Sequence, residues 1–238
     1  METKRKPITM STVVSFILIL IAIPLTLWFG WSFGNRNYYI ISILIIIYTT
    51  IPFFLAFEKR KPQARELVIL AVMCGIAVAS RAAFIWIPHF KPVIAIIIIA
   101  GAALGSEAGF LTGAMTAFVS NFIFGQGPWT PWQVFAFGMA GFLAGILFER
   151  GILKKTRLPL CIFGAVVVML VVGPILDTCT LFTMSSAMGG ASAAAIYLSG
   201  LPVNATLAVA TVLTLLLVSQ PMFEKLDRVK MKYGMMEG

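Results

Sequence analysis

The chain has few charged residues, since only 11% of its 238 residues are charged and 60% are hydrophobic. A soluble domain has about a quarter of its residues charged. A soluble fold could not bury this much apolar surface, so the composition predicts an integral membrane protein. A membrane-spanning helix needs about 20 apolar residues, so roughly eight spans would use most of the chain. This leaves no room for a soluble catalytic or nucleotide-binding domain.

Histidine and cysteine are also scarce. The chain has one histidine, His89, and three cysteines, Cys74, Cys161 and Cys179, which lie in apolar stretches without paired spacing. This pattern argues against a disulfide framework and against a dedicated transition-metal site. The sequence therefore predicts no metal and no bound cofactor. It also has no Walker A motif, no Ser/His/Asp set and no zinc-protease motif, which excludes ATP hydrolysis by a P-loop.

Eight apolar runs are separated by polar or by glycine- and proline-rich breaks. They cover about residues 10–33, 38–57, 66–87, 92–105, 107–124, 131–148, 158–182 and 195–222. The first run is too long for the core of a cleaved signal peptide. We therefore predict an all-α integral membrane protein with two N-terminal spans (1–57), a basic linker (58–65), a six-helix membrane core (66–223) and a cytoplasmic tail (224–238). Gly105 and Gly109 would permit a tight turn between the fourth and fifth spans.

Basic residues predict the topology. The net charge of +9 would suggest nucleic acid in a soluble protein, but here the positions of the charges matter more, and no nucleic-acid partner is expected. With eight spans, 15 of the 18 basic residues fall on one side, which the positive-inside rule assigns to the cytoplasm. The opposite side has only Arg36 and Lys91. An odd number of spans would split the basic clusters, so we predict eight spans in the cell membrane with both termini cytoplasmic.

Two charged residues lie within predicted spans. Arg81 is in the outer part of the third span, and Asp177 is near the outer end of the seventh. Charges at such positions are costly and usually face a partner or a cavity. One interpretation is a structural Arg81–Asp177 ion pair that joins two helices. The other places one or both residues in an outward-facing ligand cavity, and one pair could do both.

The segment FGQGPWTPWQVF is the most distinctive part of the sequence. It combines aromatic and amide side chains with glycines and prolines that shape a turn at the predicted outer surface. Such a combination suits a flat or bulky organic ligand, although tryptophan is common at membrane interfaces in any case. An asparagine deep in the last span could bind a ligand or hydrogen-bond a neighbouring helix. The predicted cavity residues are Arg81, Asn121, Gln126, Trp129, Trp132, Gln133, Asp177 and Asn204.

Pairs of small residues four positions apart let helices approach closely. They occur as Ala71 with Gly75, Gly101 with Gly105, and Gly109 with Gly113. Together with these pairs, three stretches carry a family resemblance. They are AVMCGIAVASRAAF, the block from PHFKPVIA to FGMAGFLAG, and the Pro-x-Asn of the last span. On these stretches, residues 66–223 resemble the membrane-embedded S component of energy-coupling factor (ECF) transporters, and the block from GSEAGF to GQGPWTPWQ is the most specific part.

The resemblance implies a six-helix, vitamin-binding membrane subunit without enzymatic activity. Its partners would be a membrane T component and two cytoplasmic ATPases that supply ATP hydrolysis. In this family small residues on the first core helix dock the T component, and here Ala71 and Gly75 would take that role. The two leading spans are additions to the six-helix pattern.

The resemblance leaves the vitamin open. The tryptophan-rich loop and the glycine-rich core most resemble those of S components assigned to cobalamin, so the resemblance implies a cobalamin-like compound, while riboflavin, a pyridoxine-like compound and a queuosine precursor are alternatives. A self-sufficient secondary carrier and an integral-membrane enzyme that acts on a lipid-like substrate are the competing functions.

Overall fold

The computed structural model describes Leu25 and residues 64–127, 129–184 and 193–232. The two predicted N-terminal spans and most of the basic linker therefore lie outside the described residues, and so does the end of the predicted tail. The described part of the chain is helical and contains no strand. This confirms the all-α class, while the number of eight spans and the cytoplasmic position of both termini stay predictions from the charge pattern.

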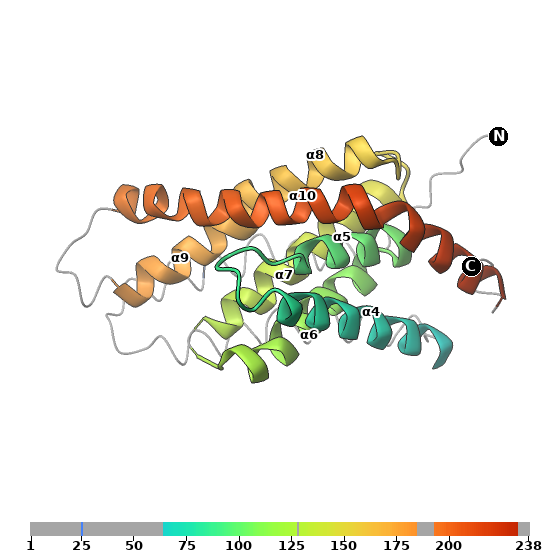
Figure 1. Cartoon of the computed structure of the whole chain (residues 1–238), viewed down its shortest axis with the longest axis horizontal. Coiled ribbons are helices and arrows are strands. Elements are labelled where there is room, and N and C mark those ends of the chain that lie inside the picture. The colour runs from blue at the N-terminus through green and yellow to red at the C-terminus, as the bar shows by residue number, and fades with distance from the viewer. Residues whose placement is uncertain (1–24, 26–63, 128, 185–192, 233–238) are drawn as a thin grey trace.

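The helices follow the predicted apolar runs closely (Figure 1). The predicted start of each of the six core runs differs by at most two residues from the start of a helix in the structure. The elements are α4 (Ala64–Ala83), α5 (Val93–Leu104), α6 (Ser106–Phe124), α7 (Thr130–Ala144), α8 (Arg157–Val167), α9 (Gly173–Met184) and α10 (Ala193–Lys232). Short π-helical turns, Gly145–Glu149 after α7 and Val168–Val172 between α8 and α9, continue the neighbouring helices.

Two features of the helices bear on the expected spans. Helix α10 is 40 residues long and continues to Lys232, so the first residues of the predicted cytoplasmic tail (224–238) extend this helix. Only four helical stretches in the described chain are long and apolar enough to cross a membrane: Ala64–Ala83, Thr130–Glu149, Arg157–Leu181 and Ala193–Lys232. Helix α5 has 12 residues, which at about 1.5 Å per residue is shorter than the hydrocarbon core.

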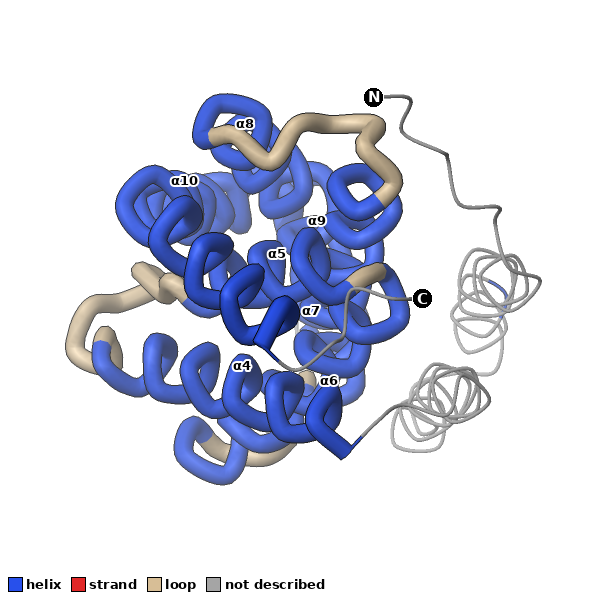
Figure 2. Tube along the Cα trace, turned by 90° about the vertical axis from the view of Figure 1, so that its right-hand side faces the viewer, coloured by secondary structure: helices blue, strands red, loops and turns tan. Residues whose placement is uncertain are grey.

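Helix α5 is the centre of the bundle. Every one of its residues is buried, and it lies among the other helices when the molecule is viewed end-on (Figure 2). Its run of isoleucines leaves it without a polar face. A helix that is apolar all round is typically enclosed on all sides. The core therefore forms around a short helix that neighbouring helices cover.

Glycines bring α5, α6 and α7 into backbone contact. A Cβ atom at Gly101 or at Gly109 would lie closer than 3.0 Å to the carbonyl oxygen of Gly141. The turn between α5 and α6 occurs at Gly105, whose φ of 102° favours glycine. Gly109 does not form part of that turn, as we had expected, but is a contact residue within α6. The predicted small-residue spacing is thus used for close packing inside the subunit.

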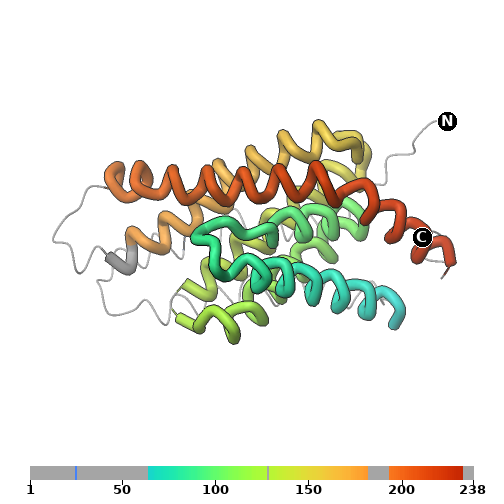
Figure 3. The backbone as a smooth tube through the Cα atoms, viewed as in Figure 1, coloured from blue at the N-terminus to red at the C-terminus, as the bar shows by residue number. Residues whose placement is uncertain are grey.

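The two ends of the bundle differ in chemistry. The start of α4 and the end of α10 lie at the same end, and the α4–α5 connection lies toward the opposite end (Figure 3). The described basic residues Arg65, Lys225 and Lys230 belong to the first of these ends. The polar residues of the predicted cavity lie toward the other end, where the charge pattern predicts the outer side of the membrane.

Candidate functional site

Arg81 is at the centre of a buried polar network between α4 and α6. It lies in the last turn of α4 and is only 9% exposed. Its Nη1 donates to Ser120 Oγ and, at 2.9 Å, to Asn121 Oδ1. Both acceptors lie in the last turn of α6 and are fully buried. These bonds compensate part of the desolvation cost of a buried guanidinium.

Thr130 links this network to the glycine- and proline-rich loop. Asn121 Nδ2 donates to Thr130 Oγ1 over 3.1 Å, and the Gly127 amide donates to the same oxygen over 3.1 Å. The Thr130 hydroxyl donates in turn to Gln126 Oε1 at 2.9 Å, and Gln126 Nε2 donates to the Phe118 carbonyl at 3.2 Å. A continuous chain of hydrogen bonds therefore fixes the loop onto the ends of α4 and α6.

The two tryptophans of the loop have different environments. Trp129 is 42% exposed; its ring lies against Gly127, and its Nε1 donates to the Gly125 carbonyl at 3.3 Å. Trp132 is only 7% exposed. The expectation that both rings lie at the outer surface is wrong for Trp132, because the first turn of α7 directs that side chain into the bundle. Of the two loop tryptophans, only Trp129 is substantially exposed.

Two cations flank one aromatic ring at this end. The Arg81 guanidinium carbon lies 4.4 Å from the centroid of the Phe124 ring and 5.7 Å from that of Phe137. The Lys91 Nζ lies 5.7 Å from the Phe124 centroid and donates to the carbonyls of Phe84 and Ile87. Partial burial, and then the positive charge of Arg81, lower the pKa of Lys91 below its usual value. The end of the bundle that carries the α4–α5 connection is thus locally electropositive.

Asp177 and Asn204 form a second polar pair, between α9 and α10. Asn204 Nδ2 donates to Asp177 Oδ2 at 2.8 Å. Each side chain lies against a glycine of the opposite helix: Asn204 on Gly173, and Asp177 on Gly200. The structure therefore corrects the proposed Arg81–Asp177 ion pair, because each of the two residues has a different partner. The sequence predicted that both charges lie within spans. It could not predict that their partners would be the neutral side chains of other helices.

Five of the eight predicted cavity residues belong to one of two hydrogen-bonded groups. Arg81, Asn121 and Gln126 belong to one network, which also contains Ser120 and Thr130, and Asp177 with Asn204 form the other pair. Gln133, on α7, has a buried side-chain oxygen without a hydrogen-bond partner. The sequence reasoning missed Ser120, Thr130, Phe124 and Lys91. The spacing of Ser120 and Asn121 at the end of a span was a usable signal, since adjacent polar residues there need partners.

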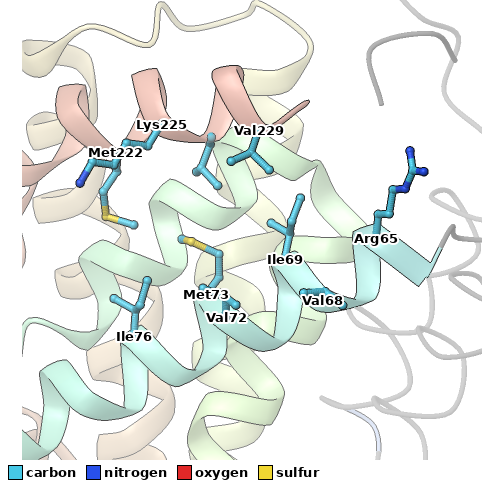
Figure 4. A pocket seen from close by; sticks show the side chains of 10 residues that line it. Arg65, Val68, Ile69, Val72, Met73, Ile76, Met222, Lys225 and Val229 are labelled. Atoms are coloured by element: carbon cyan, nitrogen blue, oxygen red, sulfur yellow. The ribbon is translucent and has the colours of Figure 1, made fainter. Parts of the chain in front are cut away.

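The residues expected to dock a partner are on the exposed face of α4. Ala71 and Gly75 are exposed, and no atom of the described residues would contact a Cβ built on Gly75. Beside them an apolar groove of about 570 Å³ lies between α4 and the last part of α10 (Figure 4). Its walls include Val72 and Ile76 of α4 and Met222 of α10. Within the described residues, this face of α4 therefore has small side chains at Ala71 and Gly75, and no helix covers it.

Among the described residues, no group of three or more His, Cys, Asp or Glu side chains could hold a metal ion. No curated protein and no solved structure matches the chain. A family model described as "ECF-type riboflavin transporter, S component" matches residues 61–222, which include α4 to α9 and most of α10. That match covers well over half of the chain and names riboflavin, so it gives no support to the expected cobalamin preference. The chain belongs to this family of ECF transporter S components, which makes it a substrate-binding membrane subunit and not an enzyme.

Proposed function

We propose that the chain binds riboflavin or a closely related flavin at the outer end of its bundle and delivers it to an ECF transporter complex. The observation that carries this proposal is the family match over residues 61–222. The polar network at the ends of α4, α6 and α7 supports it, because the same end presents an exposed aromatic ring and amide groups. A flat heteroaromatic ligand suits such a surface.

Specific side chains support the position of the flavin. Trp129 offers a ring that is 42% exposed, and Trp86, in the loop after α4, is 91% exposed. Aromatic rings stack in offset geometry on other flat rings. The Gln133 side-chain oxygen has no donor, and a buried acceptor of this kind is costly unless a donor reaches it. A flavin ring, which has both a flat face and a ring N–H, would satisfy both requirements.

The partners follow from the same proposal. A membrane T component would dock on the face of α4 that carries Ala71 and Gly75, and two cytoplasmic ATPases would supply the energy. The exposure of both residues supports this, since small residues on a free helix face permit close helix approach. The secondary carrier and the membrane enzyme are weaker alternatives, because family membership assigns neither activity.

The test is equilibrium binding by the purified full-length chain in a neutral detergent. Riboflavin is titrated, and the quenching of its fluorescence is followed, with cobalamin as competitor. We expect saturable one-to-one binding that cobalamin does not displace. Trp129→Ala should weaken binding roughly 2- to 10-fold, because it removes a stacking face. Trp132→Ala is the matched comparison and should mainly lower thermal stability. Absence of saturable riboflavin binding, or displacement by equimolar cobalamin, would contradict the flavin assignment.

A further inference from the structure

Arg81 and Lys91 are two cations close to one ring, with no described carboxylate within ion-pair distance of either. Both lie within 6 Å of the centroid of Phe124, at 4.4 and 5.7 Å. Asp177, the acidic residue that the sequence analysis considered as a partner of Arg81, is hydrogen-bonded to Asn204. Like charges that share a partly desolvated site repel each other. The arrangement is stabilised when an anion lies beside them.

The guanidinium of Arg81 uses only part of its hydrogen-bonding capacity. Its Nη1 donates to Ser120 and Asn121, and in the described part of the chain no acceptor lies on Nε or Nη2. The two bonds and the two rings of Phe124 and Phe137 hold the group in one orientation. A fixed guanidinium edge with free N–H groups matches the geometry of a carboxylate or a phosphate, which it can bind in a bidentate manner.

Gln133 is a second polar residue to consider, and it lies in the first turn of α7. It is four residues before Phe137, and residues at this spacing share one face of a helix. The Phe137 ring is 5.7 Å from the Arg81 guanidinium, and Gln133 Oε1 is buried without a donor. A buried acceptor without a partner, on the face of α7 that carries Phe137, is a second polar group that a polar ligand at this end would satisfy.

We infer that the ligand bound at this end carries an anionic group, a carboxylate or a phosphate, which binds the free edge of Arg81 while Lys91 adds a second positive charge. This inference rests on the proposed function and narrows its substrate class, because riboflavin itself has no such group. Within the flavins it predicts that a phosphorylated form binds more tightly than riboflavin. A phospholipid headgroup offers the same chemistry, so the test has to separate a soluble ligand from a lipid.

The experiment compares riboflavin with riboflavin 5′-phosphate, which differ by one anionic group, on the full-length chain. We expect the phosphorylated form to bind at least about tenfold more tightly, as a charge-assisted hydrogen bond provides. Arg81→Gln should abolish this preference, Arg81→Lys should restore only part of it because the planar fork is lost, and Lys91→Gln should reduce it. Arg150→Gln, a cation at the opposite end of the bundle, should keep it.

The outcomes distinguish failure of the anionic subsite from failure of the proposed function. Equal affinity for both flavins, unchanged in Lys91→Gln and Arg81→Gln, would overturn the anionic subsite and leave the proposed function intact. Failure of both flavins to bind would overturn the proposed function and the subsite with it. The comparison is repeated in nanodiscs of phosphatidylcholine with and without phosphatidylglycerol. Loss of the preference only when phosphatidylglycerol is present would assign the cations to a lipid headgroup and overturn the soluble-ligand assignment.

Discussion

Asn204 is a residue whose role depends on one contact. Its amide donates to Asp177, and its side chain lies on Gly173. An asparagine in the middle of an apolar helix is costly unless it is hydrogen-bonded, and a carboxylate beside it is costlier still when its donor is removed. The pair therefore joins α9 to α10, and each side chain occupies the space above a glycine of the opposite helix, without a contribution from Arg81.

We predict that Asn204→Ala lowers the free energy of unfolding by about 1–3 kcal/mol, because it leaves the Asp177 carboxylate without its donor. The measurement is thermal unfolding of the detergent-solubilised chain. Leu217→Ala, also on α10 but 74% exposed, is the control and should change stability little. An Asn204→Ala chain that unfolds at the wild-type temperature would show that the pair does not stabilise the helix contact.

The elements α5, α6 and α7 depend on glycine for their spacing. The carbonyl oxygens of Gly109 and Gly141 approach the opposite helix so closely that a methyl group has no room at either position. The obstructing atoms belong to backbone, which cannot rotate away as a side chain can. The short helix α5 is held in the centre of the bundle by these contacts, so the three elements form one tightly packed unit.

We predict that Gly109→Ala destabilises the chain by about 1–3 kcal/mol or more, because overpacking here forces two helices apart. Gly75→Ala introduces the same methyl group on the exposed face of α4, where nothing lies within 4 Å, and should change stability little. Thermal unfolding of the two variants side by side tests the difference. Equal unfolding temperatures would mean that the α6–α7 contact tolerates expansion.

At the scale of the whole molecule, the sequence predicted the helices well and their contacts poorly. Apolar runs locate helices because hydropathy is a local property, and the starts of the six core helices were found in this way. The partner of Arg81 and the burial of Trp132 could not be predicted, since both depend on how α4, α6 and α7 meet. Gly109 shows the same limit, because its spacing indicated a close approach but not which helix it contacts.

The proposed partner-docking face is also a property of the whole molecule. Ala71 and Gly75 share the exposed side of α4 with the apolar groove toward α10. The chain belongs to a family of transport subunits, and in the proposed function the T component and the ATPases supply the energy for transport. Transport should thus depend on the partners and on the absence of bulk at Gly75, whereas ligand binding at the opposite end should not.

The most direct test of the account is riboflavin uptake into liposomes that contain the chain with or without a T component and two ATPases. We predict ATP-dependent uptake only when all partners are present. Gly75→Leu should abolish uptake and pull-down of the T component while leaving flavin binding within about twofold of wild type, because the substitution is remote from the outer site. Uptake by the chain alone, without any ATPase, would contradict the account and indicate a secondary carrier.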